Sequence, residues 1–167
     1  AVIQDFFVYF TKLTEERRAN PTDDMASVVA NARINGEELS MIQTISYYVI
    51  TATAGHDTTA SAIAGGMHAL IENPDQLARL KNDLSLLNTA ADEIIRWVTP
   101  VKHFMRTATE DFPLGGKVIK AGDSVLLSYP SGNRDTDAFT DPDKFDIGRS
   151  PNKHLYAQLI PPNAATI

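Results

Sequence analysis

The sequence predicts a mainly α-helical fold with a small β region. Residues 40–71 are apolar on nearly every face at helical spacing, and they are long enough for about eight turns, roughly 45–50 Å of helix. A helix that is apolar all round belongs inside a core, so we expect other elements to surround it. Strand-like alternation with glycine turns is confined to residues 101–129.

The ends of this central helix are marked by local signals. Ser40 and Gln43 have the spacing of a capping box, in which each side chain satisfies a free amide of the first turn. Asn73 and Pro74 cannot continue a helix, because proline lacks an amide hydrogen and restricts the residue before it. The helix should therefore end just before them.

Shorter helices are expected on both sides of the central one. The segments with helical spacing are 2–19, 25–32, 75–84 and 86–99. An aspartate pair just before the second of them can supply its N-cap, and its two valines should face inward. Thr89 and Asp92 have the spacing of a capping box for the last one.

The remaining segments are short strands and turns. Residues 34–38 predict a turn or short hairpin, and residues 101–108 alternate loosely. Residues 117–119 and 124–129 are strand-like. Residues 130–151 are rich in turn-forming residues and predict an ordered loop rather than a linker.

Composition restricts the class of protein. The chain has 167 residues, 43% hydrophobic and 22% charged, which is ordinary for one globular domain. The net charge is −6 with acids and bases interspersed, and this argues against nucleic-acid binding. There is no cysteine, which excludes disulfides, thiolate metal sites and cysteine nucleophiles.

The chain begins at Ala1 with helical sequence and no signal-peptide pattern, so we expect a start inside a longer chain. The central helix contains Gln43, His56 and Asp57, which argue against a membrane span. The expected location is the cytoplasm.

Residues 54–59 (Ala-Gly-His-Asp-Thr-Thr) interrupt the apolar helix with residues that form helices poorly. A buried carboxylate at Asp57 would cost several kcal/mol unless it were paired or reached water. One reading is a kinked helix with Asp57 in a salt bridge. The other is an acid–alcohol pair, Asp57 and Thr58, facing a bound oxidant, with Ala54 and Gly55 small enough to admit a flat ligand.

Glu93 and Arg96 lie three residues apart on one predicted helix, so their side chains can meet. Most such pairs are exposed and contribute well under about 1 kcal/mol. Here apolar neighbours argue for partial burial, and Arg149 in the loop motif Phe-Asp-Ile-Gly-Arg could complete a charge network with Glu93.

The three motifs A-G-x-D-T-T, E-x-x-R and F-D-x-x-R, in this order, resemble the cytochrome P-450 family of heme-thiolate monooxygenases. The resemblance covers most of residues 1–155 and implies a partial cytochrome P-450 fold, with a long oxygen-binding helix, an E-x-x-R helix, a short β-sheet and a meander loop. It also implies heme b as cofactor.

The resemblance assigns roles to individual residues. Asp57 and Thr58 would be catalytic, delivering protons for the cleavage of dioxygen. Arg106, on its own an ordinary strand arginine, would pair with a heme propionate; His103 is either a second such partner or, as we favour, an ordinary strand histidine. The remaining implied roles are cofactor approach at Ala54 and Gly55, substrate contact at Ile50, Thr53 and Val101, and a structural network of Glu93, Arg96 and Arg149.

The segment after Leu155 departs from the family. The family's glycine-rich loop with its axial cysteine should follow His154 and Leu155, but residues 156–167 form a divergent tail, and the chain has no metal ligand of this kind. We therefore expect a fragment that is inactive on its own. The alternative is a non-catalytic helical module for ligand binding or protein interaction; no paired carboxylates or Ser-His arrangement favours a hydrolase.

Residues 96–133 resemble the bacterial terpene-hydroxylating branch, and α-terpineol hydroxylases in particular. The substrate implied is a small hydrophobic molecule of terpenoid type. The electrons would come from NAD(P)H through a ferredoxin reductase and a ferredoxin.

Overall fold

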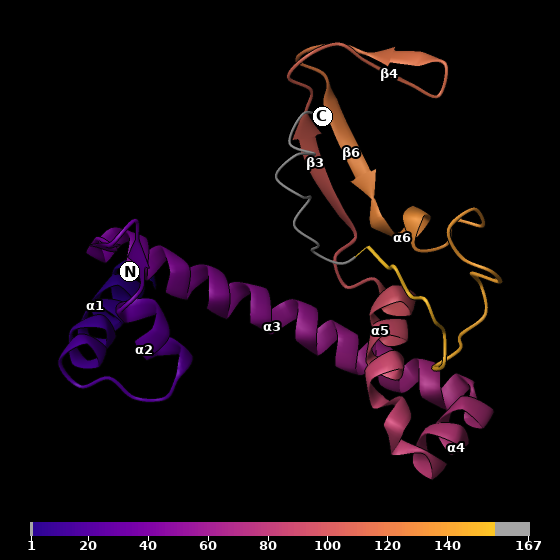
Figure 1. Ribbon diagram of the computed structural model, residues 1–167, viewed down its shortest axis with the longest axis horizontal. Coiled ribbons are helices and arrows are strands. Elements are labelled where there is room, and N and C mark those ends of the chain that lie inside the picture. Colours follow the sequence, from indigo (N-terminus) through magenta and orange to yellow (C-terminus); the bar gives the residue numbers. More distant parts are fainter. Residues whose placement is uncertain (1, 156–167) are drawn as a thin grey trace. The chain divides into compact units, whose positions relative to one another are not determined.

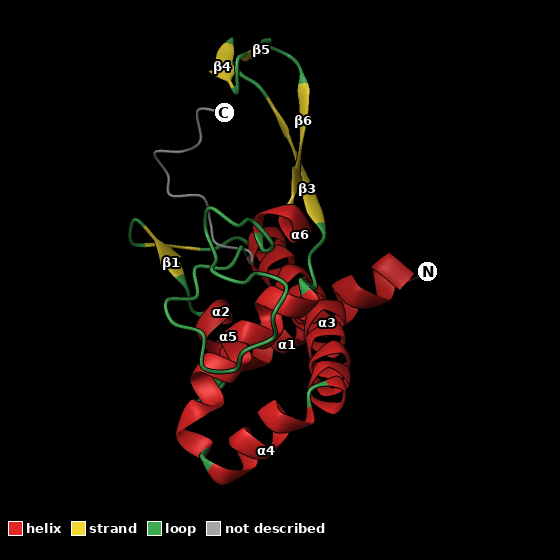
Figure 2. Cartoon of the chain, turned by 90° about the vertical axis from the view of Figure 1, so that its right-hand side faces the viewer, coloured by secondary structure: helices red, strands yellow, loops and turns green. Residues whose placement is uncertain are grey.

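The computed structural model describes residues 2–155. The chain divides into two compact units, residues 1–57 and residues 58–167 (Figure 1). Helices dominate both, and the strands are few and short (Figure 2). The predicted class, mainly α with a small β region, is confirmed. The predicted divergent tail at 156–167 lies outside the described residues.

The first unit contains α1 (Val2–Ala19), α2 (Met25–Ala30) and the antiparallel hairpin of β1 (Arg33–Ile34) and β2 (Glu37–Glu38), followed by the start of α3 (Met41–Glu72). Its core is formed by Phe10, Ile45 and Tyr48. Arg18 on α1 ties the unit together, since its guanidinium donates to the carbonyl oxygens of Ala30 and Leu39 at 2.9 and 2.7 Å.

Local chemistry explains the boundaries of α2. Asp24 is the N-cap, and its carboxylate accepts a hydrogen bond from the backbone N–H of Ser27 at 2.7 Å. The helix ends at Ala30, two residues earlier than predicted, because Asn31 caps it and the hairpin follows. The prediction that both valines face inward is wrong for Val28, which is exposed, whereas Val29 packs against the core.

The long helix α3 begins and ends where the sequence predicts. Ser40 N–H donates to Gln43 Oε1 at 2.9 Å and Gln43 N–H donates to Ser40 Oγ at 3.4 Å, which confirms the capping box. However, α3 is not buried along its length. Its buried residues gather near its two ends, because the described chain supplies close neighbours only there; these residues are Thr44, Ile45, Tyr48, Gly66, Ala69 and Leu70.

In the second unit, the end of α3 packs with α4 (Pro74–Asn82), the 3₁₀ turn η1 (Leu84–Leu86) and α5 (Leu87–Val98). The core cluster is Ala69, Leu70, Ala90, Phe145 and Ile147. Two glycines of α3 allow close packing on α5: a Cβ at Gly66 would lie 2.6 Å from Ile94 Cγ2, and one at Gly65 would lie 2.7 Å from Val98 Cγ2.

The predicted capping box of α5 is wrong. The helix has Leu86 as its N-cap without a side-chain hydrogen bond. Thr89 lies inside the first turn instead, where its hydroxyl donates to the carbonyl oxygen of Leu86 at 3.1 Å. The 3₁₀ turn leads directly into the helix, so no extended residue is present to act as a side-chain cap.

The strands of the second unit form two antiparallel pairs. β3 (His103–Thr107) pairs with β6 (Ser124–Ser128), and β4 (Phe112–Leu114) pairs with β5 (Lys117–Ile119). The short helix α6 (Tyr129–Gly132) follows, and a loop then runs through residues 133–151. The sequence did not predict β4, which has Pro113 at its centre, or α6, which is one turn long and contains Pro130.

Candidate functional site

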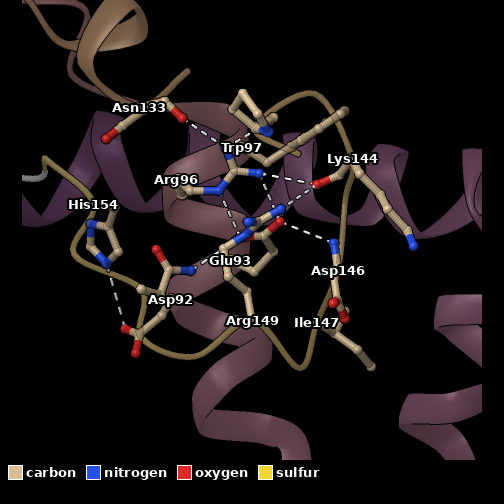
Figure 3. Close-up of polar contacts among 12 residues, drawn as sticks. Asp92, Glu93, Arg96, Trp97, Asn133, Lys144, Asp146, Ile147, Arg149 and His154 are labelled. Carbon is tan, nitrogen blue, oxygen red and sulfur yellow. Dashed lines mark hydrogen bonds and ion pairs between the residues drawn. The ribbon is translucent and has the colours of Figure 1, made fainter. Parts of the chain in front are cut away.

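Glu93 and Arg96 form a fully buried ion pair on α5 (Figure 3). Arg96 Nε donates to Glu93 Oε2 and Arg96 Nη2 donates to Oε1, both at 2.8 Å. This is a two-bond guanidinium–carboxylate contact, which fixes both side chains and gives charge-assisted hydrogen bonds. The apolar neighbours noted in the sequence therefore predicted burial correctly, although they predicted only partial burial.

Arg149 completes the network with Glu93, as Figure 3 shows. Its Nε donates to Glu93 Oε2 at 3.0 Å, and its side chain is 10% exposed. Two further donors reach the same carboxylate, the backbone N–H of Asp146 at 3.0 Å and Asn152 Nδ2 at 3.1 Å. Glu93 thus accepts five hydrogen bonds, which compensate for its removal from water.

The two arginines also hold the loop through its carbonyl oxygens. Arg96 Nη1 donates to the carbonyl oxygens of Asn133 and Pro142 at 2.7 and 2.8 Å. Both guanidinium groups reach the carbonyl oxygen of Lys144, Arg96 at 3.2 Å and Arg149 at 2.8 Å. The network therefore fastens the loop of residues 133–149 to α5.

A third cation lies beside the network. The Arg134 guanidinium carbon is 4.2 Å from the centroid of the Trp97 ring, and its Nε is 3.4 Å from Asp143 Oδ1. Burial, together with the nearby positive charge of Arg96, lowers the pKa of Arg134. The aromatic face offsets part of this cost through a cation–π contact.

Asn133 is a buried residue that the sequence reasoning missed. It is fully buried, and its side-chain amide pairs with the backbone of Leu155: Leu155 N–H donates to Asn133 Oδ1 at 2.6 Å, and Asn133 Nδ2 donates to the Leu155 carbonyl at 3.2 Å. Nδ2 also donates to Thr99 Oγ1 at 3.0 Å. An asparagine inside a turn-rich segment gives no sequence signal for such a contact.

The acid–alcohol pair lies in the middle of α3. The Asp57 side chain is 90% exposed, and His56 Nε2 lies 3.8 Å from its Oδ1. The carboxylate is therefore open to solvent in the described part of the chain, and α3 continues as a helix through residues 54–59. Nearby, Thr51 and Thr53 donate their hydroxyls to the carbonyl oxygens of Tyr47 and Val49 at 2.7 Å, as expected for threonine in a helix.

An apolar groove of about 530 Å³ lies between α1 and α3 in the first unit. It contains two of the predicted substrate residues, Ile50 and Thr53. The Thr53 hydroxyl adds little polarity to the groove, because it donates its hydrogen bond to the carbonyl oxygen of Val49. The groove is also lined by residues to which the sequence assigned no site role: Ile3, Phe6 and Phe7 of α1, and Ile45, Ser46 and Val49 of α3. The helical spacing of the α1 residues is the sequence signal that indicated which of them share one face of the helix.

The other predicted residues lie on α3, on β3 and just after α5. A Cβ at Gly55 would meet no atom within 4 Å, so the backbone there is open, and Ala54 next to it is exposed. Arg106 lies on β3, where Nη1 donates to the Met105 carbonyl at 2.9 Å and the guanidinium carbon is 5.7 Å from the Phe104 ring centroid. Val101 is half-buried just after α5.

The described residues contain no group of three or more His, Cys, Asp or Glu side chains placed to hold a metal. The sequence has no cysteine at all, so the chain cannot supply an axial thiolate. Within the described part of the chain, no helix combines the length and apolar character that crossing a bilayer requires.

The buried Glu-Arg-Arg network and the long helix agree with the comparison to known families. Residues 1–155 match the sequence profile of the family described as Cytochrome P450. The chain belongs to the cytochrome P450 family, and the resemblance inferred from the three motifs is confirmed.

Three relatives show how far the similarity extends. "Cytochrome P450-terp" from Pseudomonas sp is 48% identical over 92% of this chain and 36% of its own length. "Steroid C26-monooxygenase" from Mycolicibacterium smegmatis is 47% identical over 88% of this chain and 34% of its own. The crystal structure of CYP108D1 from Novosphingobium aromaticivorans is 50% identical, with a TM-score of 0.84 over 92% of this chain and 37% of that one. The chain spans about a third of each relative.

Proposed function

We propose that this chain is a segment of a heme-dependent monooxygenase that inserts one atom of dioxygen into a small hydrophobic substrate. The observation that carries the proposal is the buried network of Glu93, Arg96 and Arg149, found in a chain of the cytochrome P450 family. A non-catalytic helical module is not favoured, because the chain belongs to the cytochrome P450 family and matches relatives named as monooxygenases.

In the complete protein, heme b would supply the oxygen chemistry and the protein would supply position and proton delivery. The residues proposed for proton delivery are Asp57 and Thr58, which are adjacent on α3 and offer a carboxylate and a hydroxyl for proton transfer. Ala54 and Gly55 would let the flat cofactor approach the helix backbone, and Arg106 would pair with a propionate.

The chain by itself does not fit thiolate-ligated heme, since it contains no cysteine. We therefore expect this polypeptide to be inactive alone. The whole protein would be cytoplasmic and would receive electrons from NAD(P)H through a ferredoxin reductase and a ferredoxin, as proposed for the soluble bacterial branch.

The proposed substrate is a small terpenoid. The groove between α1 and α3 supports it, because Ile50 lies among apolar side chains and Thr53 has its hydroxyl internally bonded. Val101 would provide a further apolar contact. Because one relative is named as a steroid monooxygenase, a larger apolar molecule such as a steroid is the competing substrate class.

The test is a chimera in which residues 1–155 replace the matching segment of the P450-terp relative, which retains its own remaining sequence. The chimera should show the reduced carbon monoxide spectrum of a thiolate-ligated heme and should hydroxylate a monoterpenoid in preference to a steroid. Thr58→Ala should lower the product formed per NAD(P)H consumed, and Thr58→Ser, which keeps the hydroxyl, should restore it. A correctly ligated chimera in which Thr58→Ala changes nothing would contradict the assigned role.

A further inference from the structure

We propose that Gln76 and Arg79 of α4 are positioning residues for the Glu93–Arg149 network. They hold the turn of residues 146–148, from which Arg149 reaches Glu93. The meaning of the network for catalysis rests on the proposed function. The positioning itself is a property of this chain, and its test can fail independently of that function.

Gln76 binds the backbone in the middle of the turn. Its side-chain Oε1 accepts a hydrogen bond from the N–H of Ile147 at 3.2 Å, and both residues are buried. Gln76 Nε2 donates to Asp75 Oδ2 at 2.8 Å, and this bond orients the amide so that the oxygen faces the turn. That same bond lowers the pKa of Asp75.

Arg79 binds the first residue of the turn through its side chain. Arg79 Nη1 donates to Asp146 Oδ1 at 2.8 Å, and the same oxygen accepts the N–H of Gly148 at 2.9 Å. The N–H of Gly148, with the smaller contribution of Arg79, lowers the pKa of Asp146. Asp146 also donates its own N–H to Glu93, so one residue is held by α4 through its side chain and by α5 through its backbone.

Gly148 makes room for this contact. A Cβ at that position would collide with Arg79 Nη2 and would lie 3.0 Å from Arg79 Cζ. The guanidinium is the end of a flexible side chain and could swing away, but only by giving up its ion pair with Asp146. The absence of a side chain at Gly148 therefore allows the close approach of Arg79 to the turn.

The Arg79–Asp146 ion pair is one of three contacts that α4 makes with residues 146–148. The two side chains are 46% and 36% exposed, and exposed pairs contribute little to stability. Three contacts converge on three consecutive residues: a buried amide hydrogen bond at Ile147, a shared carboxylate at Asp146 and an absent side chain at Gly148.

Amide hydrogen exchange of the full chain, followed by nuclear magnetic resonance, tests the proposal. Gln76→Ala should speed exchange of the Ile147 amide by about tenfold, the effect of losing one hydrogen bond. It should also shift the Nε–H resonance of Arg149, because the turn that carries Arg149 is no longer held. Arg79→Ala should raise the pKa of Asp146 and shift the same resonance, and Arg79→Lys should partly restore both. The matched control is Lys81→Ala, another cation on α4, which should change neither.

A double substitution keeps the steric argument falsifiable. Gly148→Ala should speed exchange at residues 146–148 in the unsubstituted chain but not in an Arg79→Ala background, where the collision is gone. Equal effects in both backgrounds would overturn the role of Arg79. An unchanged Arg149 resonance in Gln76→Ala would reduce Gln76 to a local contact, and fast exchange at residues 146–148 in the unsubstituted chain would overturn the proposal altogether.

Discussion

Replacing Glu93 with alanine should destabilise the second unit severely. The substitution removes the carboxylate that accepts five hydrogen bonds and leaves the guanidinium of Arg96, which is fully buried, without a counter-charge. Removing one partner of a buried ion pair costs about 3–5 kcal/mol. Because domains are stable by only about 5–15 kcal/mol, this loss would bring the unit close to unfolding.

Urea unfolding monitored by fluorescence measures this effect where it occurs. Trp97 is the only tryptophan, and its ring lies 5.5 Å from that of Phe145 in the same core. The matched control is Lys120→Ala, which removes an ion pair of the same unit whose members, Lys120 and Asp111, are 64% and 53% exposed; it should leave the midpoint nearly unchanged. Equal midpoints for Glu93→Ala and Lys120→Ala would refute the reasoning.

Three further outcomes are expected. The pKa of Asp24 is held well below its ordinary value of 3.8, chiefly by a backbone N–H at the start of α2. The contribution of Asp24 to stability is therefore complete above pH 3.8 and is lost as the pH falls below that value. Acid titration by circular dichroism should be shallower for Asp24→Asn than for the unsubstituted chain. Gly66→Ala should lower the free energy of unfolding by about 1–3 kcal/mol, and with it the thermal midpoint, because the new Cβ would meet Ile94. Gly55→Ala places its Cβ in open space and should stabilise the helix by up to about 1 kcal/mol. Asn133→Ala should cost about 1–3 kcal/mol in urea unfolding, because it removes the hydrogen-bond partner of the Leu155 backbone N–H and carbonyl oxygen, and an unchanged midpoint would show that water replaces it.

Local signals in the sequence determined most of the helix boundaries. The capping box at Ser40 and Gln43 and the proline at position 74 set the two ends of α3, since both act within a few residues. The capping box at Thr89 failed because a preceding 3₁₀ turn supplies the helix start, and this depends on packing rather than on local spacing.

The candidate site was predictable only in part, because some of its contacts depend on packing and not on local spacing. Glu93 and Arg96 are three residues apart on one helix, so sequence spacing is enough to pair them. Their contact with Arg149 was suggested by its place in the loop motif Phe-Asp-Ile-Gly-Arg, and Arg149 Nε lies 3.0 Å from Glu93 Oε2. The contacts of Gln76 with Ile147 and of Asn133 with Leu155 join positions far apart in the chain, and no local pattern marks them.

The expectation of a fully buried central helix shows a limit of reasoning from hydrophobicity. Ile50, Ile63 and Met67 are more than half exposed, although their apolar character predicts a core position. The pattern describes what the helix is suited to contact. It does not identify the contacting segment, and this chain spans about a third of its relatives.

The most direct measurement is a heme titration of the purified chain, followed by an absorption spectrum of the reduced form with carbon monoxide bound. We predict either no binding or a spectrum without the red-shifted band of thiolate-ligated heme, because no residue of the chain can supply that ligand. The appearance of the red-shifted band would contradict the account of this chain as a cytochrome P450 segment that lacks its own axial ligand.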